Sequence, residues 1–451
     1  MMKRIFLLLS CAGALVLGAC GSDSGLPEAG GKASVRAINA VLTSPEIDFF
    51  IQERLLGQIA YKQGSVTTRW DDLEYTFNFD VLYAGETSRT RFAGQFIDVE
   101  ANKDYTLLVS GSLANPTITV WEGEEASFEE TDTVFEARFA HATASQGALD
   151  YYFASPGVAP VLGEQVATLA FGEATVAEDL AAGDYVLTIT MAGDPTAVVY
   201  TSDTITFPAL AAYIITSFDG DANDNGPIFV RAIGMLGGAI GMRDARFPPS
   251  VEFVNASMDL GTSDIYDDEP LTSLRVANHA YLDLSAEVSV ATGANTFYYT
   301  PAGDTSAVTF ETTQSTLGGL RFRILASGVA GSLLATNVIP DRVPVETAVK
   351  LLAFHASNNF EFLDIYVVDA GESIDEALPR RAGLTAGLPA LTTRLATGSY
   401  DMYVTEFAKK VVLAGPYRLD VTVGDIVDTV IVDTVDPAVL DVLFLSGGPA
   451  P

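Results

Sequence analysis

The pair His355 and Asp364, in the stretch AFHASNNFEFLDIYV (353–367), has the residue types of an acid–base site. A histidine that is oriented by an aspartate can accept the proton of a nucleophile and act as a general base. The chain has only 3 histidines, so this pair is the first candidate for catalytic chemistry. Its meaning depends on what stands at the same place elsewhere in the chain.

The same spacing occurs four times, with Asn or His followed nine residues later by Asp. The four pairs are Asn39 with Asp48, His141 with Asp150, Asn255 with Asp264, and His355 with Asp364. An Asn amide does not exchange protons near neutral pH, so catalysis is not the shared role. Asn and His share a donor and an acceptor, and Asp commonly accepts backbone N–H bonds in turns. We interpret these residues as structural clamps on the loop between the first two strands of each repeat. A binding site built on that loop is the alternative.

These pairs mark four domain-sized repeats. Each repeat contains about seven short segments rich in Val, Ile, Thr, Tyr and Phe, separated by Gly, Pro, Asn and Asp turns. The pattern predicts an all-β fold of tandem immunoglobulin-like antiparallel β-sandwich domains. The expected β-sandwich repeats span 34–130, 131–247, 248–346 and 347–451.

The repeats also resemble a known family. An apolar stretch ending in Asn or His and Ala, an Asp followed by apolar or aromatic residues, and a later AAGDY (181–185) or ATGSY (396–400) are similar to bacterial domain of unknown function 4397. The resemblance implies secreted or lipid-anchored β-domains in tandem. It supplies no established activity and no catalytic residues.

The N-terminus has the pattern of a secretion signal. Two basic residues precede the apolar run IFLLLSCAGALVL (5–17), which is shorter than the roughly 20 residues of a membrane-spanning helix. We predict a signal peptide over residues 1–19. Residues 20–33 are small and polar, as expected of a flexible tether.

The signal ends in a sequence that resembles the lipobox of bacterial lipoproteins. Leu17, Gly18 and Ala19 precede Cys20, which the resemblance makes the lipidated N-terminus of the mature protein. Gly21 at the next position implies the outer membrane, with the periplasmic or cell-surface face left open. The predicted membrane contact is therefore the lipid anchor. With Cys11 removed and Cys20 lipidated, the mature chain has no thiol for a disulfide or a zinc site.

The chain is strongly acidic. It has 58 Asp and Glu against 25 Lys and Arg, a formal net charge of −33. Phosphate backbones are repelled by such a surface, so we expect no nucleic-acid partner.

One acidic segment has the oxygen ligands that calcium prefers. The stretch FDGDANDNGP (218–227) departs from an EF-hand, because Asp stands where that loop needs Gly. An ordinary turn rich in Asp and Asn is the leading interpretation, and a calcium site is the alternative. The candidate ligands are Asp219, Asp221, Asn223, Asp224 and Asn225. No other cofactor is expected.

The sequence contains no G-x-S-x-G elbow, H-E-x-x-H helix or P-loop. We therefore expect no enzyme, but a cell-envelope lipoprotein with a structural, adhesive or ligand-display role and a protein or glycan partner. The alternative is a glycan- or small-solute-binding module with sites in clefts between domains. A surface hydrolase is the second alternative. The oligomeric state and the identity of the partner are left open.

Overall fold

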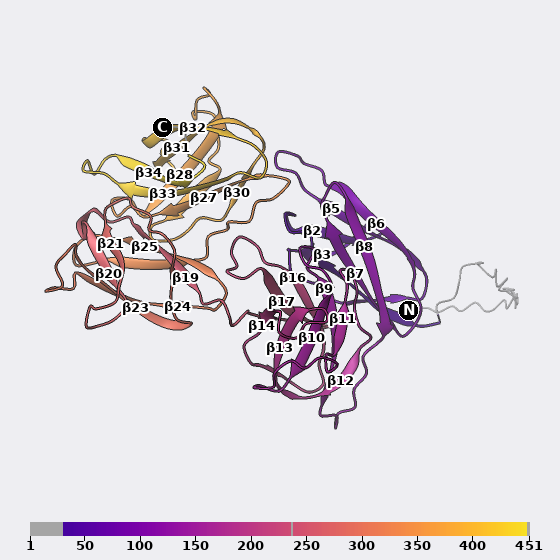
Figure 1. Cartoon of the computed structure of the whole chain (residues 1–451). Coiled ribbons are helices and arrows are strands. Elements are labelled where there is room, and N and C mark those ends of the chain that lie inside the picture. The colour runs from indigo at the N-terminus through magenta and orange to yellow at the C-terminus, as the bar shows by residue number, and fades with distance from the viewer. Residues whose placement is uncertain (1–29, 236–237, 449–451) are drawn as a thin grey trace, which may run out of the picture.

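The computed structural model describes residues 30–235 and 238–448 (Figure 1). These ranges form 34 strands, β1 to β34, and one short 3-10 helix, Met258–Leu260. The predicted signal peptide (1–19), its lipobox and Cys20 lie outside the described residues. Within the described ranges, no helix has the length and hydropathy of a membrane span. The predicted fold class, all-β with tandem sandwiches, is confirmed.

The strands form four groups, and each group folds as two facing sheets. We call the sheet that contains the first strand of a repeat its first-strand sheet, and the other its second-strand sheet. In repeat 1 the first-strand sheet has the order β4-β1-β7-β8, formed by β1 (Lys32–Asn39), β4 (Thr68–Asp71), β7 (Lys103–Gly111) and β8 (Pro116–Glu124). Its second-strand sheet has the order β3-β2-β5-β6, formed by β2 (Ile47–Ile51), β3 (Arg54–Ile59), β5 (Glu74–Val81) and β6 (Thr90–Asp98).

Repeat 2 has the same plan with additional strands. Its first-strand sheet, β12-β9-β16-β17-β18, contains β9 (Val134–Ala142), β12 (Glu178–Ala181), β16 (Ala212–Asp219), β17 (Ile228–Gly234) and β18 (Ala239–Met242). Its second-strand sheet, β11-β10-β13-β14 with β15 also paired to β13, contains β10 (Leu149–Ala154), β11 (Ala167–Leu169), β13 (Gly183–Met191), β14 (Val198–Thr201) and β15 (Ile205–Phe207).

Repeats 3 and 4 return to four strands in each sheet. In repeat 3 the sheets β22-β19-β25-β26 and β21-β20-β23-β24 contain β19 (Ser250–Asn255), β20 (Ser263–Tyr266), β21 (Leu274–His279), β22 (Val288–Ser289), β23 (Gly293–Pro301), β24 (Phe310–Thr316), β25 (Arg321–Ser327) and β26 (Leu334–Val338). In repeat 4 the sheets β30-β27-β33-β34 and β29-β28-β31-β32 contain β27 (Val349–His355), β28 (Phe362–Asp369), β29 (Arg381–Thr385), β30 (Thr393–Leu395), β31 (Gly398–Glu406), β32 (Val412–Val421), β33 (Ile426–Asp433) and β34 (Leu440–Ser446).

Two details differ from the expected seven antiparallel strands. Each repeat has an additional edge strand of two to four residues, β4, β12, β22 or β30, which is too short to show a periodic pattern in the sequence. The first strand of every repeat also pairs in parallel with a later strand, as β1 does with β7 and β27 with β33. In each first-strand sheet, the first strand lies between the short edge strand and a later strand that runs in the same direction, such as β7 beside β1.

Each sandwich has its own apolar core between its two sheets. In repeat 1, Val35 and Leu107 of the first-strand sheet pack against Phe49 and Phe79 of the second-strand sheet, and all four are almost fully buried. Equivalent cores fill repeats 2, 3 and 4. In these strands, alternate residues point into the sandwich, as the period of two in a strand requires.

The first-strand sheets also bury their outer faces, which joins the repeats in pairs. Ile38 and Leu108 of repeat 1 pack against Ile214 and Phe218 of repeat 2. Trp121 adds a polar contact across the interface, because its Nε1 donates to the carbonyl of Gly172 at 2.8 Å. Repeats 1 and 2 therefore form one four-layered block, the lobe that carries the indigo and magenta strands in Figure 1.

Repeats 3 and 4 are joined through the same sheets. Val254 and Leu325 of repeat 3 pack against Phe354 and Val430 of repeat 4. These residues form the second lobe, coloured orange and yellow in Figure 1. The repeats are thus two blocks of two sandwiches and not a row of four separate domains, because an apolar outer face has to be covered to leave water.

We expect Phe218→Ala to destabilise the first block strongly. Phe218 is fully buried and its ring lies edge-on to Tyr61 of repeat 1, with 6.2 Å between the centroids. Loss of a buried Phe side chain lowers the free energy of unfolding by about 3–5 kcal/mol. Urea denaturation measures this change. The control is Phe96→Ala in β6, where the residue is 56% exposed. Equal losses for the two variants would show that the interface is not coupled to folding.

Candidate functional site

The Asn of the odd-numbered repeats closes the loop between the first two strands. Asn39 Nδ2 donates to the carbonyl of Ile59 at 3.1 Å, and Asn39 Oδ1 accepts from the backbone N–H of Val41 at 2.9 Å. Asn255 makes the equivalent two kinds of bond in repeat 3. Both amides are buried, so these bonds satisfy polar backbone groups that water does not reach.

His141 closes the equivalent loop in repeat 2. Its Nδ1 accepts from the backbone N–H of Thr143 at 3.1 Å, and its Nε2 lies 2.9 Å from the carbonyl of Gly147. This arrangement fits a neutral ring with the proton on Nε2. Burial lowers the pKa of His141, which favours the same neutral form.

The structure places His355 and Asp364 in separate environments. His355 is fully buried, and among the described residues neither ring nitrogen has a hydrogen-bond partner. Burial lowers its pKa to about 4, against smaller opposing effects of the Phe360 backbone and Asp433. The Asp364 carboxylate instead accepts from the backbone N–H of Gly383 at 2.8 Å. The two side chains therefore do not form a dyad in this structure.

The four aspartates have different hydrogen-bond partners from those expected of a clamp on the first loop. Each stands near the start of the second strand and binds outside the loop that precedes it. Asp264 accepts from the backbone N–H groups of Asn278 and Gly303, both at 2.8 Å. In repeat 3 the second strand, β20, lies between the edge strand β21 and the central strand β23. Its Asp therefore accepts one bond from the edge strand and one from the turn after the central strand. Asp150 likewise binds Gly193 N–H at 2.7 Å.

In repeat 1 the same position uses side chains as donors. Asp48 accepts from Gln58 Nε2 at 2.9 Å and forms an ion pair with Arg89. The position of the carboxylate is therefore kept while the chemistry of its donors changes.

The acidic segment 219–225 joins three repeats. Asp219 accepts from the backbone N–H groups of Ala144 and Ser145 within repeat 2, at 2.9 and 3.1 Å. Tyr61 of repeat 1 donates its hydroxyl to the carbonyl of Asp219 at 2.7 Å. From repeat 3, Arg321 Nε donates to Asn225 Oδ1 at 3.1 Å.

Lys62 of repeat 1 supplies the cation of this segment. Its buried ammonium lies 2.7 Å from Asp221 Oδ2 and forms a second ion pair with Asp224. Burial raises the pKa of Asp224, and the charge of Lys62 opposes that rise. An uncompensated carboxylate here would be costly, so the ammonium of Lys62 offsets the charges of both Asp221 and Asp224.

A calcium site, the alternative interpretation of this segment, is not supported by this geometry. The five candidate ligands do lie in one loop, but their side-chain oxygen atoms already accept hydrogen bonds from donors of the protein. Asn223 Oδ1, for instance, accepts from the backbone N–H of Arg342 at 3.2 Å. In the described ranges, no group of three or more His, Cys, Asp and Glu side chains is arranged to hold a metal ion.

A cavity of about 800 Å³ lies between repeats 1 and 2. Its walls are mostly apolar and come from β16, the β17–β18 hairpin and the segment after β8; they include Phe128, Tyr213 and Ile240. At one side Arg69 pairs with Glu125, with 2.8 Å between Nη2 and Oε2. The cavity therefore has an apolar interior and a neutralised ion pair at its edge.

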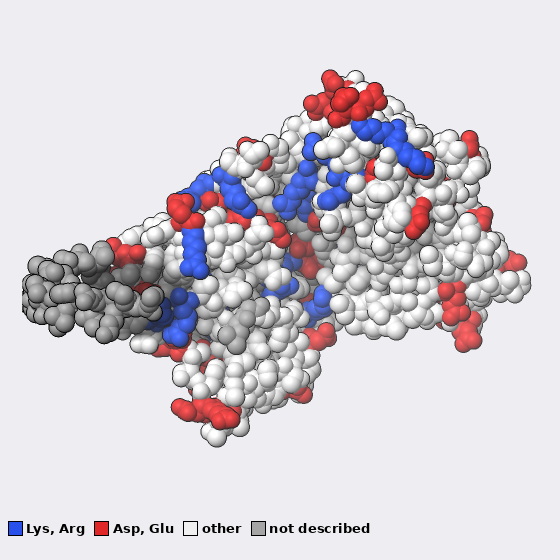
Figure 2. All heavy atoms as spheres, turned by 180° about the vertical axis from the view of Figure 1, so that it is seen from behind, with Lys and Arg blue, Asp and Glu red and all other residues white. Residues whose placement is uncertain are grey.

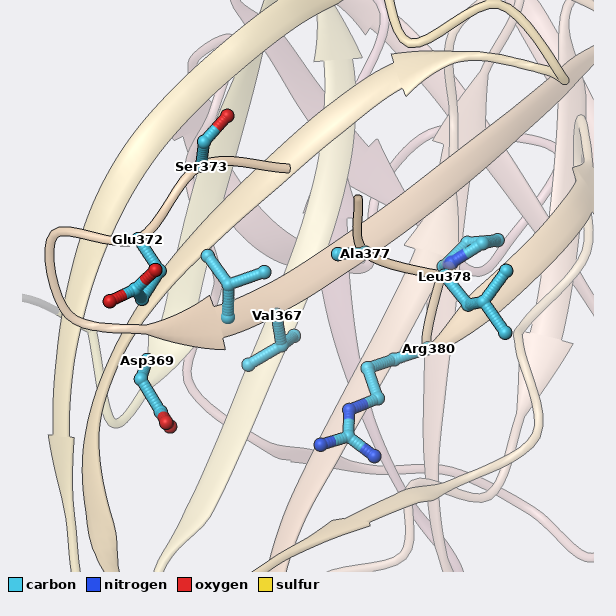
Figure 3. A pocket seen from close by; sticks show the side chains of 9 residues that line it. Val367, Asp369, Glu372, Ser373, Ala377, Leu378 and Arg380 are labelled. Carbon is cyan, nitrogen blue, oxygen red and sulfur yellow. The ribbon is translucent and has the colours of Figure 1, made fainter. Parts of the chain in front are cut away.

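A second, more open hollow lies on the surface of repeat 4. It has a volume of about 510 Å³ and is formed by the long β28–β29 connection. Figure 3 shows Asp369 and Glu372 on one side of Val367, with Leu378 and Arg380 on the other. Leu378 is 85% exposed, so the hollow offers an apolar side chain between charges of both signs.

Spacing within single repeats did not reveal Lys62 or the cavity. A comparison of repeats 1 and 3 does offer one signal of the pair interface, a tyrosine at the same place in both repeats. Tyr61 in repeat 1 and Tyr281 in repeat 3 follow the third strand, and each donates across its pair interface. Their acceptors are the carbonyls of Asp219 and Asp433, at 2.7 and 2.5 Å.

His355→Asn is expected to change the pH dependence of stability. The histidine pKa is lower in the folded chain than in the unfolded chain, so the unfolded chain binds the proton first. The wild-type free energy of unfolding is therefore fully retained above about pH 6.5 and falls toward pH 4, by about 3 kcal/mol for this group. His355→Asn should lose that part of the dependence, since Asn fills the position in repeats 1 and 3. Urea denaturation between pH 7.5 and 4.5 tests this, and identical slopes would contradict it.

Comparisons with known proteins match part of the chain to a family without an assigned function. Among solved structures, the Bacillus anthracis TIE protein is similar over 90% of this chain and 69% of that chain, at 9% identity and a TM-score of 0.15. No curated protein matches the chain. Residues 33–152, which contain repeat 1, β9 and the first part of β10, match the family model of DUF4397, a domain of unknown function. The resemblance read from the repeat motifs is therefore confirmed over residues 33–152.

Proposed function

We propose that this chain is a non-catalytic lipoprotein of the outer membrane that displays contact loops on two rigid blocks of β-sandwiches. The observation that carries the proposal is the apolar interface within each pair of repeats. Interfaces that are as buried as a domain core hold their partners in one orientation. Loops at the ends of such blocks keep fixed positions relative to one another.

The environment of His355 and Asp364 in repeat 4 supports a role without catalysis. A general base has to reach the proton that it removes, and His355 is fully buried with its pKa lowered to about 4. In repeats 1 and 3 an Asn amide fills the same position and holds backbone groups. These contacts favour a structural use of the position in repeats 1 and 3, while His355 is buried without such contacts among the described residues.

Two long connections supply surfaces for a partner. The β10–β11 connection in repeat 2 exposes Val161 and Leu162, by 49% and 60%. The β28–β29 connection in repeat 4 forms the hollow beside Leu378. Exposed apolar side chains on rigidly supported loops are typical contact residues. A protein or glycan held on these loops is the partner that this function requires.

The lipid anchor is tested by Cys20→Ser. We expect the full-length variant to lose both palmitate labelling and retention in the membrane fraction when it is produced in a Gram-negative host. The control is Cys11→Ser, because Cys11 lies within the predicted signal peptide and should not carry lipid. Unchanged labelling of the Cys20→Ser protein would refute the anchor.

The cavity between repeats 1 and 2 favours a second candidate function, the binding of a small solute. Its volume of about 800 Å³ is in the usual range for small-molecule sites. The apolar walls and the paired charges of Arg69 and Glu125 favour an uncharged apolar molecule. Such a site is compatible with loop display, because it uses a different surface.

Gly238→Leu tests this second function. Gly238 lines the cavity and a Cβ there would meet no atom within 4 Å, so we expect Leu to fit without a clash and to occupy part of the cavity. With the neutral probe N-phenyl-1-naphthylamine, we expect binding to the wild type and a loss of about tenfold or more in affinity for the variant. Gly57→Leu is the matched control, because a side chain there also meets no atom within 4 Å but lies away from the cavity. Equal binding by all three proteins would exclude the cavity as the site.

A further inference from the structure

Arg231 in β17 and Arg243, directly after β18, are neighbours where repeats 1, 2 and 3 meet. Arg231 pairs with Gly241 across the hairpin, so Arg243 is its diagonal neighbour on the same face of the sheet. Diagonal neighbours are about 7–8 Å apart, within reach of two long side chains. A Cβ built on Gly319 of repeat 3 would lie 3.9 Å from the Cβ of Arg243, which shows how closely that repeat approaches.

Neither guanidinium has a carboxylate partner among the described residues. Both side chains are partly buried, and the Nε of Arg231 is a fully buried donor without an acceptor. Asp224 attracts both arginines only at longer range and already pairs with Lys62, and Asp203 attracts Arg243 in the same way. Burial lowers the pKa of Arg231, and the charge of Arg243 lowers it further.

Most other buried cations of the described residues are compensated directly by a carboxylate, whereas Arg138 donates to the carbonyls of Thr175 and Glu122. Arg323 lies between Glu252 and Asp428, at 2.6 Å from each. Arg36 pairs with Asp104 at 3.1 Å. Buried charges are normally paired in this way because leaving water is costly for an ion. The hairpin arginines depart from that rule in a chain with a net charge of −33, which has acidic side chains in excess.

The surroundings leave the hydrogen-bonding edges of one guanidinium available. Arg231 stacks over the ring of Phe229, with its Cζ 5.5 Å from the centroid. Stacking uses the flat face of a guanidinium and leaves its N–H groups in the plane to bind a ligand. Figure 2 shows Lys and Arg side chains in the hollow between the two lobes, and Arg231 and Arg243 are both only partly buried.

We propose that Arg231 and Arg243 bind a small oxyanion, a phosphate or carboxylate group, at the junction of repeats 1, 2 and 3. Planar guanidinium groups donate two parallel N–H bonds to such groups, which makes arginine the usual residue for this recognition. The bound anion removes the repulsion between the two arginines. Since repeat 3 begins the second block, the anion also stabilises the contact between the two blocks.

The group could belong to a phosphorylated or to an acidic-sugar ligand, and two probes separate these sources. Inorganic phosphate and galacturonate are titrated into the full-length protein at low ionic strength by isothermal titration calorimetry, with chloride held constant. We expect the wild type to bind at least one of them at millimolar concentration or below. Binding of phosphate alone assigns a phosphoryl ligand, and binding of galacturonate alone assigns a carboxylate. Binding of neither probe would overturn the proposal.

Arg231→Gln and Arg243→Gln locate the site. Each should weaken binding of the active probe by about tenfold or more, since one charge-assisted pair of hydrogen bonds is lost. Arg275→Gln is the matched control, because Arg275 is already paired with Asp267 at 2.6 Å, and it should bind as the wild type does. Undiminished binding by both hairpin variants would place the anion elsewhere and refute the site.

The same variants also test the unpaired state of the arginines. In chloride without either probe, both variants should melt at or above the wild-type temperature, because an uncompensated buried charge has been removed. A large fall in melting temperature would mean that each arginine already has a stabilising partner within the protein, and the proposal would fail for that reason.

Discussion

The first-strand sheet of every repeat has two apolar faces, and its own sandwich covers only one of them. In β1, Val35 and Ala37 face the core of repeat 1 while Ile38 faces repeat 2, so the strand is buried on both sides. A sheet of this kind stays stable in water only when something packs on its second face. The neighbouring repeat provides that cover, and the rest of the architecture follows from this requirement.

The pair, rather than the single repeat, is therefore the structural unit that the chain duplicates. Odd repeats carry Asn39 and Asn255 at the clamp position, and even repeats carry His141 and His355. The hydroxyl bonds of the two odd-repeat tyrosines run to the same strand end in both blocks. The alternation of Asn and His follows the two places in a pair, which explains why the two residue types are not distributed at random.

Polar contacts join the first block to the second at the acidic segment. The acidic segment 219–225 extends from repeat 2 toward both neighbours, and Lys62 of repeat 1 and Arg321 of repeat 3 bind it from opposite repeats. A loop with the composition of a calcium site thus serves as a junction between domains, because a lysine ammonium is available from another repeat. The unpaired arginines of the β17–β18 hairpin lie at the same junction, so ligand binding there would act on the relation between the blocks.

The sequence by itself determined the features that depend on neighbouring residues. The period of the apolar residues and the positions of Gly, Asn and Asp turns predict strands, and the nine-residue spacing of Asn or His and Asp predicts four similar units. Asn39 and His141 bond to residues only two positions further along the chain, so a sequence pattern can suggest their place at the first loop. Only the tertiary structure decided the partners of Asp264, the pairing of repeats and the contact of Lys62 with Asp221. That contact joins residues 159 positions apart, and no local pattern records which distant surface will cover an apolar face or neutralise a charge.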